Sequence, residues 1–211
     1  MTDITHHTSD AMLAAYASGN LPHPFALVVA AHVSLCLDCR AALEAHQAVG
    51  GALLDAAPVE ALSDTLKDRL FAQLDDPVPV EPVYRRTGAY PGPVMEALKG
   101  RKPRWKPLGM GVRQCILSAD DQGSARLLYI PPGRAVPDHS HKGLELTLVL
   151  QGSFSDATGR FGVGDLEIAD EDLEHTPVAD EGAPCICLAA TDAPLTFNAL
   201  MPRLLQPLFR I

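Results

Sequence analysis

Residues 32–39 read His-Val-Ser-Leu-Cys-Leu-Asp-Cys and bring one imidazole and two thiols into a single short segment. Residues four apart lie on the same face of a helix, so His32 and Cys36 can point in the same direction if a helix reaches that far. Cys36 and Cys39 have the spacing of a zinc knuckle at the start of a helix. Thiolate and imidazole ligands favour zinc among the divalent ions. The segment therefore predicts a structural zinc site with three local ligands.

Residues 32–39 do not identify the fourth ligand of this site. A closed structural zinc site needs a further donor, and either His6 or His7, both upstream, could supply it. The alternative is that this histidine pair is exposed polar sequence in front of a helix. For Cys36 and Cys39 the alternative is a buried or redox-active pair, but the neighbouring histidine at ligand spacing favours a metal.

Helical periodicity surrounds the segment. Ser9 can cap one helix at its start, and Gly19 can end it. Pro24 can lie in the first turn of a second helix, where proline is tolerated. A third helix is expected to follow Cys36 and to fade at Gly50. The pattern thus predicts four short helices, at 10–18, 25–34, 37 to about 49, and after Ser63.

The fourth of these helices carries an apolar stripe with the spacing of one helix face. Phe71 lies beside the stripe, and such a stripe is more often core than binding surface. Four short helices make a small core, however, so a structural zinc would help to hold them together. Part of the stripe could also remain open for a partner. The stripe consists of Leu62, Leu66, Leu70 and Leu74.

A proline-rich, basic stretch follows the helices. Seven prolines between Pro77 and Pro107 exclude long helices and central strands, so we expect a connector, or an arm or edge strand that enters the next domain. Residues 77–111 hold 2 acidic and 7 basic residues, against 10 and 3 in residues 1–76 and 14 and 7 in residues 112–211. Two acidic bodies lack the basic face of a nucleic-acid-binding protein, and they suit a basic protein partner.

From Gly111 onward, short apolar runs alternate with Gly, Asp and Pro. Many short strands with regular turns predict a sandwich or a small barrel. The expected strands are 112–118, 125–130, 145–151, 154–157, 161–163, 165–168, 174–178, 185–190 and 195–197.

A second group of metal-ligating residues falls among these strands. His139 and His141 are two apart, so their side chains face the same side of a strand. Glu145 follows on the next strand segment, and His175 comes after a turn at 162–165. Three imidazoles and a carboxylate suit zinc, iron, manganese, nickel or copper. The alternative is that these are ordinary polar residues that line the barrel.

The five cysteines do not form a disulfide scaffold in a chain of 211 residues. Cys185 and Cys187 face the same way on an expected strand; we favour a core role, and the alternative is an oxidisable pair that lines a cavity. Cys115 is expected in the core. We find neither an apolar run long enough to span a bilayer nor a signal peptide, so we expect a soluble cytoplasmic protein with no membrane contact.

His7, followed by His32-x3-Cys36-x2-Cys39 within a short helical segment, resembles the zinc-binding anti-sigma domain. The resemblance implies that His7, rather than His6, completes a zinc site with His32, Cys36 and Cys39. The stretch HHTSDAMLAAYASGNL, residues 6–21, is also similar to the start of ChrR-type anti-sigma factors.

The second group of ligands is similar to the cupin signature, which implies a small β-barrel that holds a metal. Two positions depart from it, since Val163 stands where many cupins have proline and Ala179 where they often have asparagine. A helical zinc domain followed by a cupin is the ChrR arrangement. The resemblance thus implies a two-domain chain: an all-α zinc-binding helical domain at 1–76, a Pro-rich basic linker at 77–110, an all-β cupin barrel at 111–198 and a C-terminal tail at 199–211.

The function implied is that of an anti-sigma factor, not of an enzyme. The helical domain would hold zinc and would bind and inhibit an extracytoplasmic-function sigma factor. The cupin would hold zinc or another divalent transition metal and would respond to singlet oxygen or an organic hydroperoxide. The alternatives are a cupin dioxygenase or isomerase with an accessory zinc domain, and a structural adaptor for another protein. Beyond the metal ligands we find no acid–base pair or substrate clamp, which disfavours the enzyme.

Overall fold

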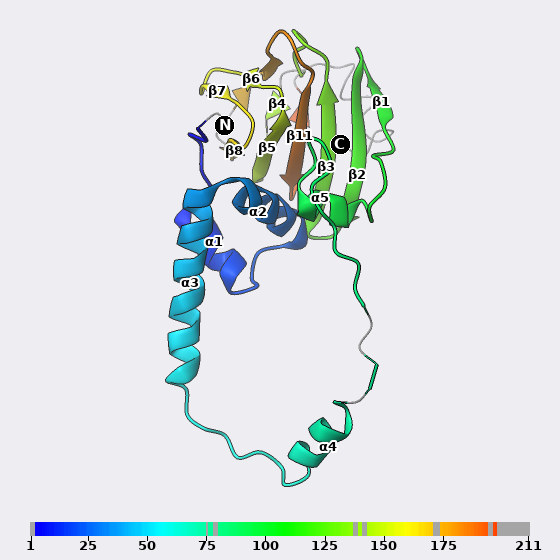
Figure 1. Cartoon of the computed structure of the whole chain (residues 1–211). Coiled ribbons are helices and arrows are strands. Elements are labelled where there is room, and N and C mark those ends of the chain that lie inside the picture. The colour runs from blue at the N-terminus through cyan, green and yellow to red at the C-terminus, as the bar shows by residue number, and fades with distance from the viewer. Residues whose placement is uncertain are drawn as a thin grey trace.

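The computed structural model describes residues 3–74, 76–77, 80–136, 139–140, 143–170, 174–193 and 196–197. A helical region comes first and a β region second (Figure 1). The helices are α1 (Asp10–Ala17), α2 (His23–Leu35), α3 (Leu37–Asp55), α4 (Leu66–Ala72) and α5 (Gly92–Ala97). The expected tail at 199–211 lies outside the described residues.

Local signals in the sequence set the ends of the first helices. The hydroxyl of Ser9 accepts a hydrogen bond from the backbone N–H of Met12 at 3.2 Å and caps α1, and Gly19 ends it in the left-handed region at φ +72°. The expected end of α3 at Gly50 is wrong, because the helix continues to Asp55. Glycine costs a helix only about 1 kcal/mol, and the alanines and leucines that follow are good helix formers.

The described residues of the β region form one large antiparallel sheet and two small ones. The large sheet has the strand order β1-β2-β3-β11-β5-β8, and the small sheets have the orders β10-β6-β7 and β12-β4-β9. As expected for the proline-rich stretch, β1 is an edge strand. The strands are β1 (Lys106–Gly109), β2 (Val112–Asp120), β3 (Gly123–Ile130), β4 (His139–Ser140), β5 (Glu145–Gln151), β6 (Phe154–Ser155), β7 (Arg160–Phe161), β8 (Leu166–Ala169), β9 (Glu174–His175), β10 (Val178–Ala179), β11 (Cys185–Thr191) and β12 (Thr196–Phe197).

The two faces of the large sheet pack against different partners. Alternate residues of a strand point to opposite faces, so Leu148 and Val149 enter separate cores. On the first face α2 lies against β3, β5 and β11, and Val28 and Leu148 belong to one continuous apolar cluster (Figure 1). On the second face Val149 packs with Phe154 and Phe161 of the small sheet β10-β6-β7. The helices and the large sheet therefore share a hydrophobic core.

The proline-rich stretch also contributes to this shared core. Val94 and Met95 of α5 are buried in the same cluster as α2, and α5 contacts that helix. Proline at the start of α5 is compatible with the first turn of a helix. Residues 92–97 are thus part of the packed structure.

The segment around α4 lies apart from the rest. Figure 1 shows it on a long loop that leaves the end of α3 and returns to α5. No residue of α4 is buried, and Leu70 and Phe71 are more than half exposed. The prediction that the leucine stripe belongs to the core is therefore wrong, because its helix is not buried against any other element in the described part of the chain. Leu62 and Leu74, at the ends of the stripe, are 73% and 72% exposed.

Among the described residues, no single helix has both the length and the apolar character needed to cross a membrane. Helices α2 and α3 meet that test only when they are taken together, and they are bent by 116° at their junction.

Candidate metal centre

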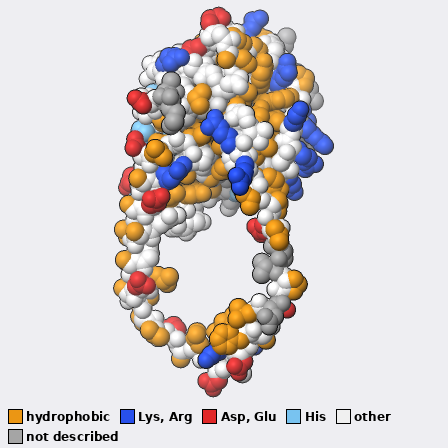
Figure 2. Space-filling model, viewed as in Figure 1, with side chains coloured by type: hydrophobic (Ala, Val, Ile, Leu, Met, Phe, Trp, Pro, Cys, Tyr) orange, Lys and Arg blue, Asp and Glu red, His pale blue; other side chains and the backbone are white. Residues whose placement is uncertain are grey.

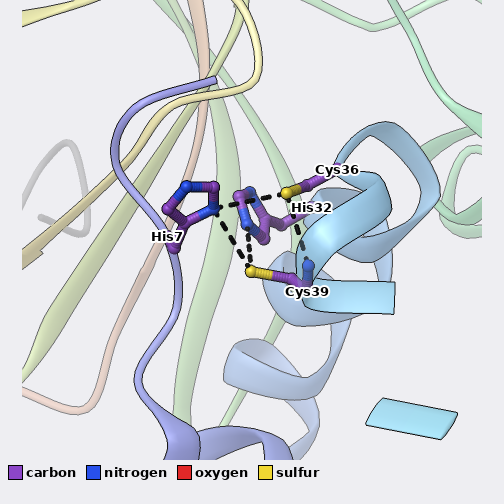
Figure 3. Close-up of side chains that lie close together, drawn as sticks. All are labelled: His7, His32, Cys36 and Cys39. Atoms are coloured by element: carbon purple, nitrogen blue, oxygen red, sulfur yellow. Dashed lines mark hydrogen bonds between the residues drawn. The ribbon is translucent and has the colours of Figure 1, made fainter. Parts of the chain in front are cut away.

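Four side chains from three segments meet where α2 ends and α3 begins (Figure 3). His32 lies in the last turn of α2, Cys36 is the residue between the two helices, and Cys39 lies in the first turn of α3. His7 comes from the extended segment before α1. The donor atoms of the four residues all lie within 4.8 Å of one another.

The distances suit a tetrahedral zinc ion. The Nε2 atom of His32 lies 3.2 Å from Cys39 Sγ, and the Nδ1 atom of His7 lies 3.3 Å from Cys36 Sγ and 3.5 Å from Cys39 Sγ. Zinc–sulfur bonds of about 2.3 Å and zinc–nitrogen bonds of about 2.0 Å place tetrahedral ligands roughly 3.3–3.8 Å apart. The arrangement can hold a zinc ion with little movement.

Burial sets the proton state of these groups in the absence of a metal. His32 is fully buried, and burial lowers its pKa from 6.5 to about 4, so its ring is neutral at pH 7. Burial also raises the pKa of Cys39 to about 11. A neutral imidazole is ready to bind a metal, whereas the thiol of Cys39 must release a proton when the metal binds.

His6 and His7 point to different parts of the molecule. The ring of His7 lies with the two sulfur atoms, whereas the ring of His6 packs on Phe161, with ring centres 4.3 Å apart. The Nδ1 atom of His6 also lies 3.5 Å from a carboxylate oxygen of Asp165. The structure thus brings His7, and not His6, to the cluster.

Gly164 and Asp165 of the β region form hydrogen bonds next to this cluster. In the sequence these two residues indicate only a turn. The Nδ1 atom of His32 donates a hydrogen bond to the carbonyl oxygen of Gly164 at 3.0 Å. The carboxylate of Asp165 accepts hydrogen bonds from the backbone N–H groups of Thr5 and His6, at 2.7 and 2.9 Å. No local pattern reveals these contacts, because about 130 to 160 residues separate the partners.

The second expected group of ligands is described only in part. His139 of β4 and His175 of β9 are paired across two antiparallel strands, so their backbones are adjacent. His141 and the side chains of His139 and His175 lie outside the described residues. Glu145 opens β5, and its carboxylate accepts a hydrogen bond from the hydroxyl of Thr147 at 2.9 Å. A metal site on these residues stays a prediction.

The remaining cysteines are buried, as expected. Cys185 and Cys187 belong to the core between the large sheet and the small sheet β10-β6-β7, and their sulfur atoms lie 3.4 Å apart. The hydrogen bond with Cys185 and burial raise the pKa of Cys187 well above its usual value, so its thiol is protonated at pH 7. Cys187 pairs with Val149 of β5, on the sheet face that also carries Glu145. Cys115 lies in the core shared with the helices.

Known proteins are similar to this chain in both its helical region and its β region. A family model described as the ChrR cupin-like domain matches residues 95–193. The chain is 54% identical over 211 residues to the anti-sigma-E factor ChrR of Cereibacter sphaeroides, and the match covers 99% of each chain. The structure is similar to the crystal structure of Rhodobacter sphaeroides SigE in complex with the anti-sigma ChrR, with a TM-score of 0.81 and 54% identity over 90% of this chain and 100% of that chain. Identity at this level over nearly the whole length shows that the chain belongs to the ChrR family of anti-sigma factors.

Proposed function

We propose that this chain acts in the cytoplasm and inhibits transcription by binding an extracytoplasmic-function sigma factor. The observation that carries this proposal is the similarity, over 90% of the chain, to a ChrR protein captured in complex with SigE. A regulatory protein that sequesters a sigma factor needs a surface for that partner and performs no reaction of its own.

The surface that we assign to the sigma factor is the apolar arm, defined as residues 49–74, from the C-terminal half of α3 to the end of the α4 segment. Figure 2 shows apolar side chains along this arm and gathered over α4. Leu54 is 77% exposed and Phe71 is 56% exposed. Large exposed apolar side chains that gather on one segment in this way are typical of a protein-binding site.

The short length of α4 and its lack of buried residues support the same assignment. Helix α4 has 7 residues and buries none of them. Isolated helices shorter than about 12–15 residues are marginal in water, so a partner is needed to stabilise α4. A sigma factor that covers Leu70 and Phe71 would supply the missing packing.

We infer that zinc occupies the cluster of His7, His32, Cys36 and Cys39. Two thiolates and two imidazoles at tetrahedral spacing are the usual ligands of structural zinc. Zinc would link the segment before α1 to the junction of α2 and α3, and so would fix the direction in which α3 leaves the body of the protein. Because α3 leads into the apolar arm, the metal supports the sigma-binding surface.

We further infer that the three sheets close into a cupin barrel and that His139, His141, Glu145 and His175 hold a second divalent metal. By resemblance to ChrR-type proteins, the signal is singlet oxygen or an organic hydroperoxide. A change at the β region then lowers the affinity for the sigma factor. Release requires that the signal stabilise the free form of the protein more than the bound form.

The function is tested by purification of the full chain from cells under mild conditions, followed by identification of the bound proteins. We expect an extracytoplasmic-function sigma factor at a 1:1 ratio. In transcription assays with that sigma factor and core RNA polymerase, the added chain should reduce transcript from its promoter. Recovery of no sigma factor by the intact chain would falsify the proposal.

A further inference from the structure

We propose that Gly164 and Asp165, in the turn between β7 and β8, are positioning residues of the His/Cys metal site, so that the site is built jointly by the helical and β regions. The inference rests on the proposed binding of zinc to His7, His32, Cys36 and Cys39. Its basis is a set of hydrogen bonds that join this one turn to two of the three ligand-bearing segments.

The first link fixes the orientation of His32. Its Nδ1 atom lies 3.0 Å from the carbonyl oxygen of Gly164. A carbonyl oxygen can only accept a hydrogen bond, so Nδ1 carries the proton and Nε2 carries the lone pair. Nε2 is the atom that faces Cys39 Sγ at 3.2 Å. An outer hydrogen bond that selects the tautomer of a histidine is a common way to prepare it for a metal.

The second link holds the segment that carries His7. One carboxylate oxygen of Asp165 accepts hydrogen bonds from the backbone N–H groups of Thr5 and His6, and the other accepts one from the N–H of Gly162 at 2.8 Å. In return, the N–H of Leu166 donates to the carbonyl oxygen of His6 at 3.1 Å. With the hydroxyl of Thr5, which donates to Asp165 at 3.4 Å, four hydrogen bonds fix residues 5 and 6 against the turn, and His7 is the next residue.

The carboxylate is well adapted to this role. Asp165 is buried, and burial alone would raise its pKa. The N–H groups of Gly162, His6 and Thr5 outweigh that effect, so the pKa is lower than usual and the group is charged at pH 7. Charged acceptors make stronger hydrogen bonds than neutral ones.

The turn itself is held rigidly by the sheet. The N–H of Gly164 donates to the carbonyl oxygen of Val149 at 2.9 Å, and the N–H of Val149 donates to the carbonyl oxygen of Asp165 at 3.1 Å. Gly164 has φ +94°, and a Cβ atom there would lie 2.5 Å from the Cδ1 atom of Ile4. Only glycine fits this turn with Ile4 packed against it.

The consequence is a short physical route between the two regions. Val149 lies on β5, the strand that opens at Glu145, and β5 pairs with β8 from Glu145↔Ala169 to Leu148↔Leu166. A displacement of β5 or β8 would move the turn, and the turn contacts the segments of His7 and His32 directly. The route passes through the turn and the N-terminal segment.

The test compares two substitutions in the full chain, Asp165→Asn and Asp180→Asn. Asp180 is the matched control, because its carboxylate likewise accepts several hydrogen bonds, all of them from within the β region: from Ser153, Ser155 and Arg160 at 2.6, 2.9 and 2.8 Å. Cobalt is added as the probe, since thiolate-to-cobalt charge-transfer absorption reports the cysteine site and not a His/Glu site. Cys39→Ser identifies the band by weakening it, since it removes one of the two thiolates.

We expect Asp165→Asn to weaken cobalt and zinc binding at the cysteine site by about 10- to 100-fold, the usual effect of losing an outer-shell partner. The charge-transfer band should return at saturating metal, and Asp165→Glu should recover part of the affinity. Asp180→Asn should lower the melting temperature while leaving the affinity within about twofold of wild type.

Thr5→Pro is the second variant, because it removes the N–H and the hydroxyl with which the exposed Thr5 donates to Asp165, and it leaves the sequence of the β region unchanged. It decides the question if Asp165→Asn fails to fold, and it should weaken the metal in the same direction. Wild-type affinity in the folded variants, or an equal loss in Asp180→Asn, would overturn the inference. Absence of the thiolate band in the wild type would instead contradict the proposed zinc site.

Discussion

The Nδ1 atom of His32 and the carbonyl oxygen of Gly164 lie 3.0 Å apart, although 132 residues separate them in the chain. The contact joins a candidate metal ligand at the end of α2 to a turn of the β region. Because His32 is fully buried, this contact at Nδ1 and the contact of Nε2 with Cys39 Sγ orient its ring. The cluster of His7, His32, Cys36 and Cys39 is therefore shaped from both sides of the molecule.

Removal of a thiolate should disrupt the helical region. In Cys36→Ala or Cys39→Ala the junction between α2 and α3 loses a zinc ligand, and zinc binding and folding are coupled in sites of this kind. We expect loss of helical circular dichroism and of sigma-factor binding. Cys115→Ala is the control, since Cys115 is buried but is not one of the four grouped ligand residues, and it should cost on the order of 1 kcal/mol. Full affinity of a zinc-free Cys39→Ala protein would show that the metal has no structural role.

The apolar arm should contribute to binding and little to stability. Phe71→Asp places a charge where the sigma factor is proposed to pack, and loss of a central apolar contact typically costs at least about 2 kcal/mol, or roughly 30-fold in Kd. Phe71 is exposed in the free protein, so the free energy of unfolding should change by no more than about 0.5 kcal/mol. Calorimetric titration and urea unfolding measure the two quantities.

The control for the arm is Met110→Asp. Met110 is also exposed, but it lies in the turn between β1 and β2, outside residues 49–74. The Met110→Asp variant should bind the sigma factor with wild-type affinity. Equal losses in both variants would mean that added negative charge, and not the arm, causes the effect.

How much the sequence predicts depends on how local each feature is. The ligand spacing within residues 32–39 is set by helix geometry, so the sequence is enough to predict that His32, Cys36 and Cys39 lie close together. The choice of His7 over His6 depended on family resemblance, because either could reach the thiols. The positions of strands could also be predicted, since turn residues and the pattern of apolar residues mark them, as at β5 (Glu145–Gln151).

Features that depend on tertiary packing could not be predicted in the same way. The contacts of Gly164 and Asp165 join segments more than a hundred residues apart, and neither residue has a local signal beyond a turn. The leucine stripe around α4 has the periodicity of a buried face, but periodicity identifies a face and does not say what covers it. The shared core of α2 and the large sheet likewise depends on how two separately predicted regions meet.

The β region is expected to carry the response to oxidant. His141→Ala combined with Glu145→Ala removes two of the four proposed ligands of the second metal, while the apolar arm and the His/Cys cluster remain intact. We expect unchanged affinity for the sigma factor in the resting state and a much smaller release of it after treatment with singlet oxygen or an organic hydroperoxide. Release is measured as transcript from a sigma-dependent promoter, and an unchanged response would remove the sensor role of this site.

Acid should weaken the β region through Asp180. Hydrogen bonds from Ser153 and Ser155, together with Arg160, lower the pKa of this carboxyl below its usual 3.8. A carboxyl whose pKa is lowered on folding adds stability above the unfolded pKa, and that contribution is lost as the pH falls through the folded pKa. Urea unfolding should show wild type more stable than Asp180→Asn at pH 7, with the difference shrinking below about pH 3.8. A constant difference down to pH 3 would exclude this origin.

The shared core predicts that the helical and β regions unfold together. Leu148 of β5 is fully buried in the apolar cluster that includes Val28 of α2, so Leu148→Ala should cost about 2–5 kcal/mol. Two probes report the two regions: helical circular dichroism, and the fluorescence of the single tryptophan, Trp105, whose ring packs on Tyr129 of β3. We expect both transitions to shift to lower urea by the same amount and to coincide, as for one cooperative unit. Leu53→Ala, on the exposed arm, should leave both in place. If Leu148→Ala moves the fluorescence transition alone, the contact between α2 and the sheet contributes little to stability, and a signal in the β region would have to reach the helices by another route.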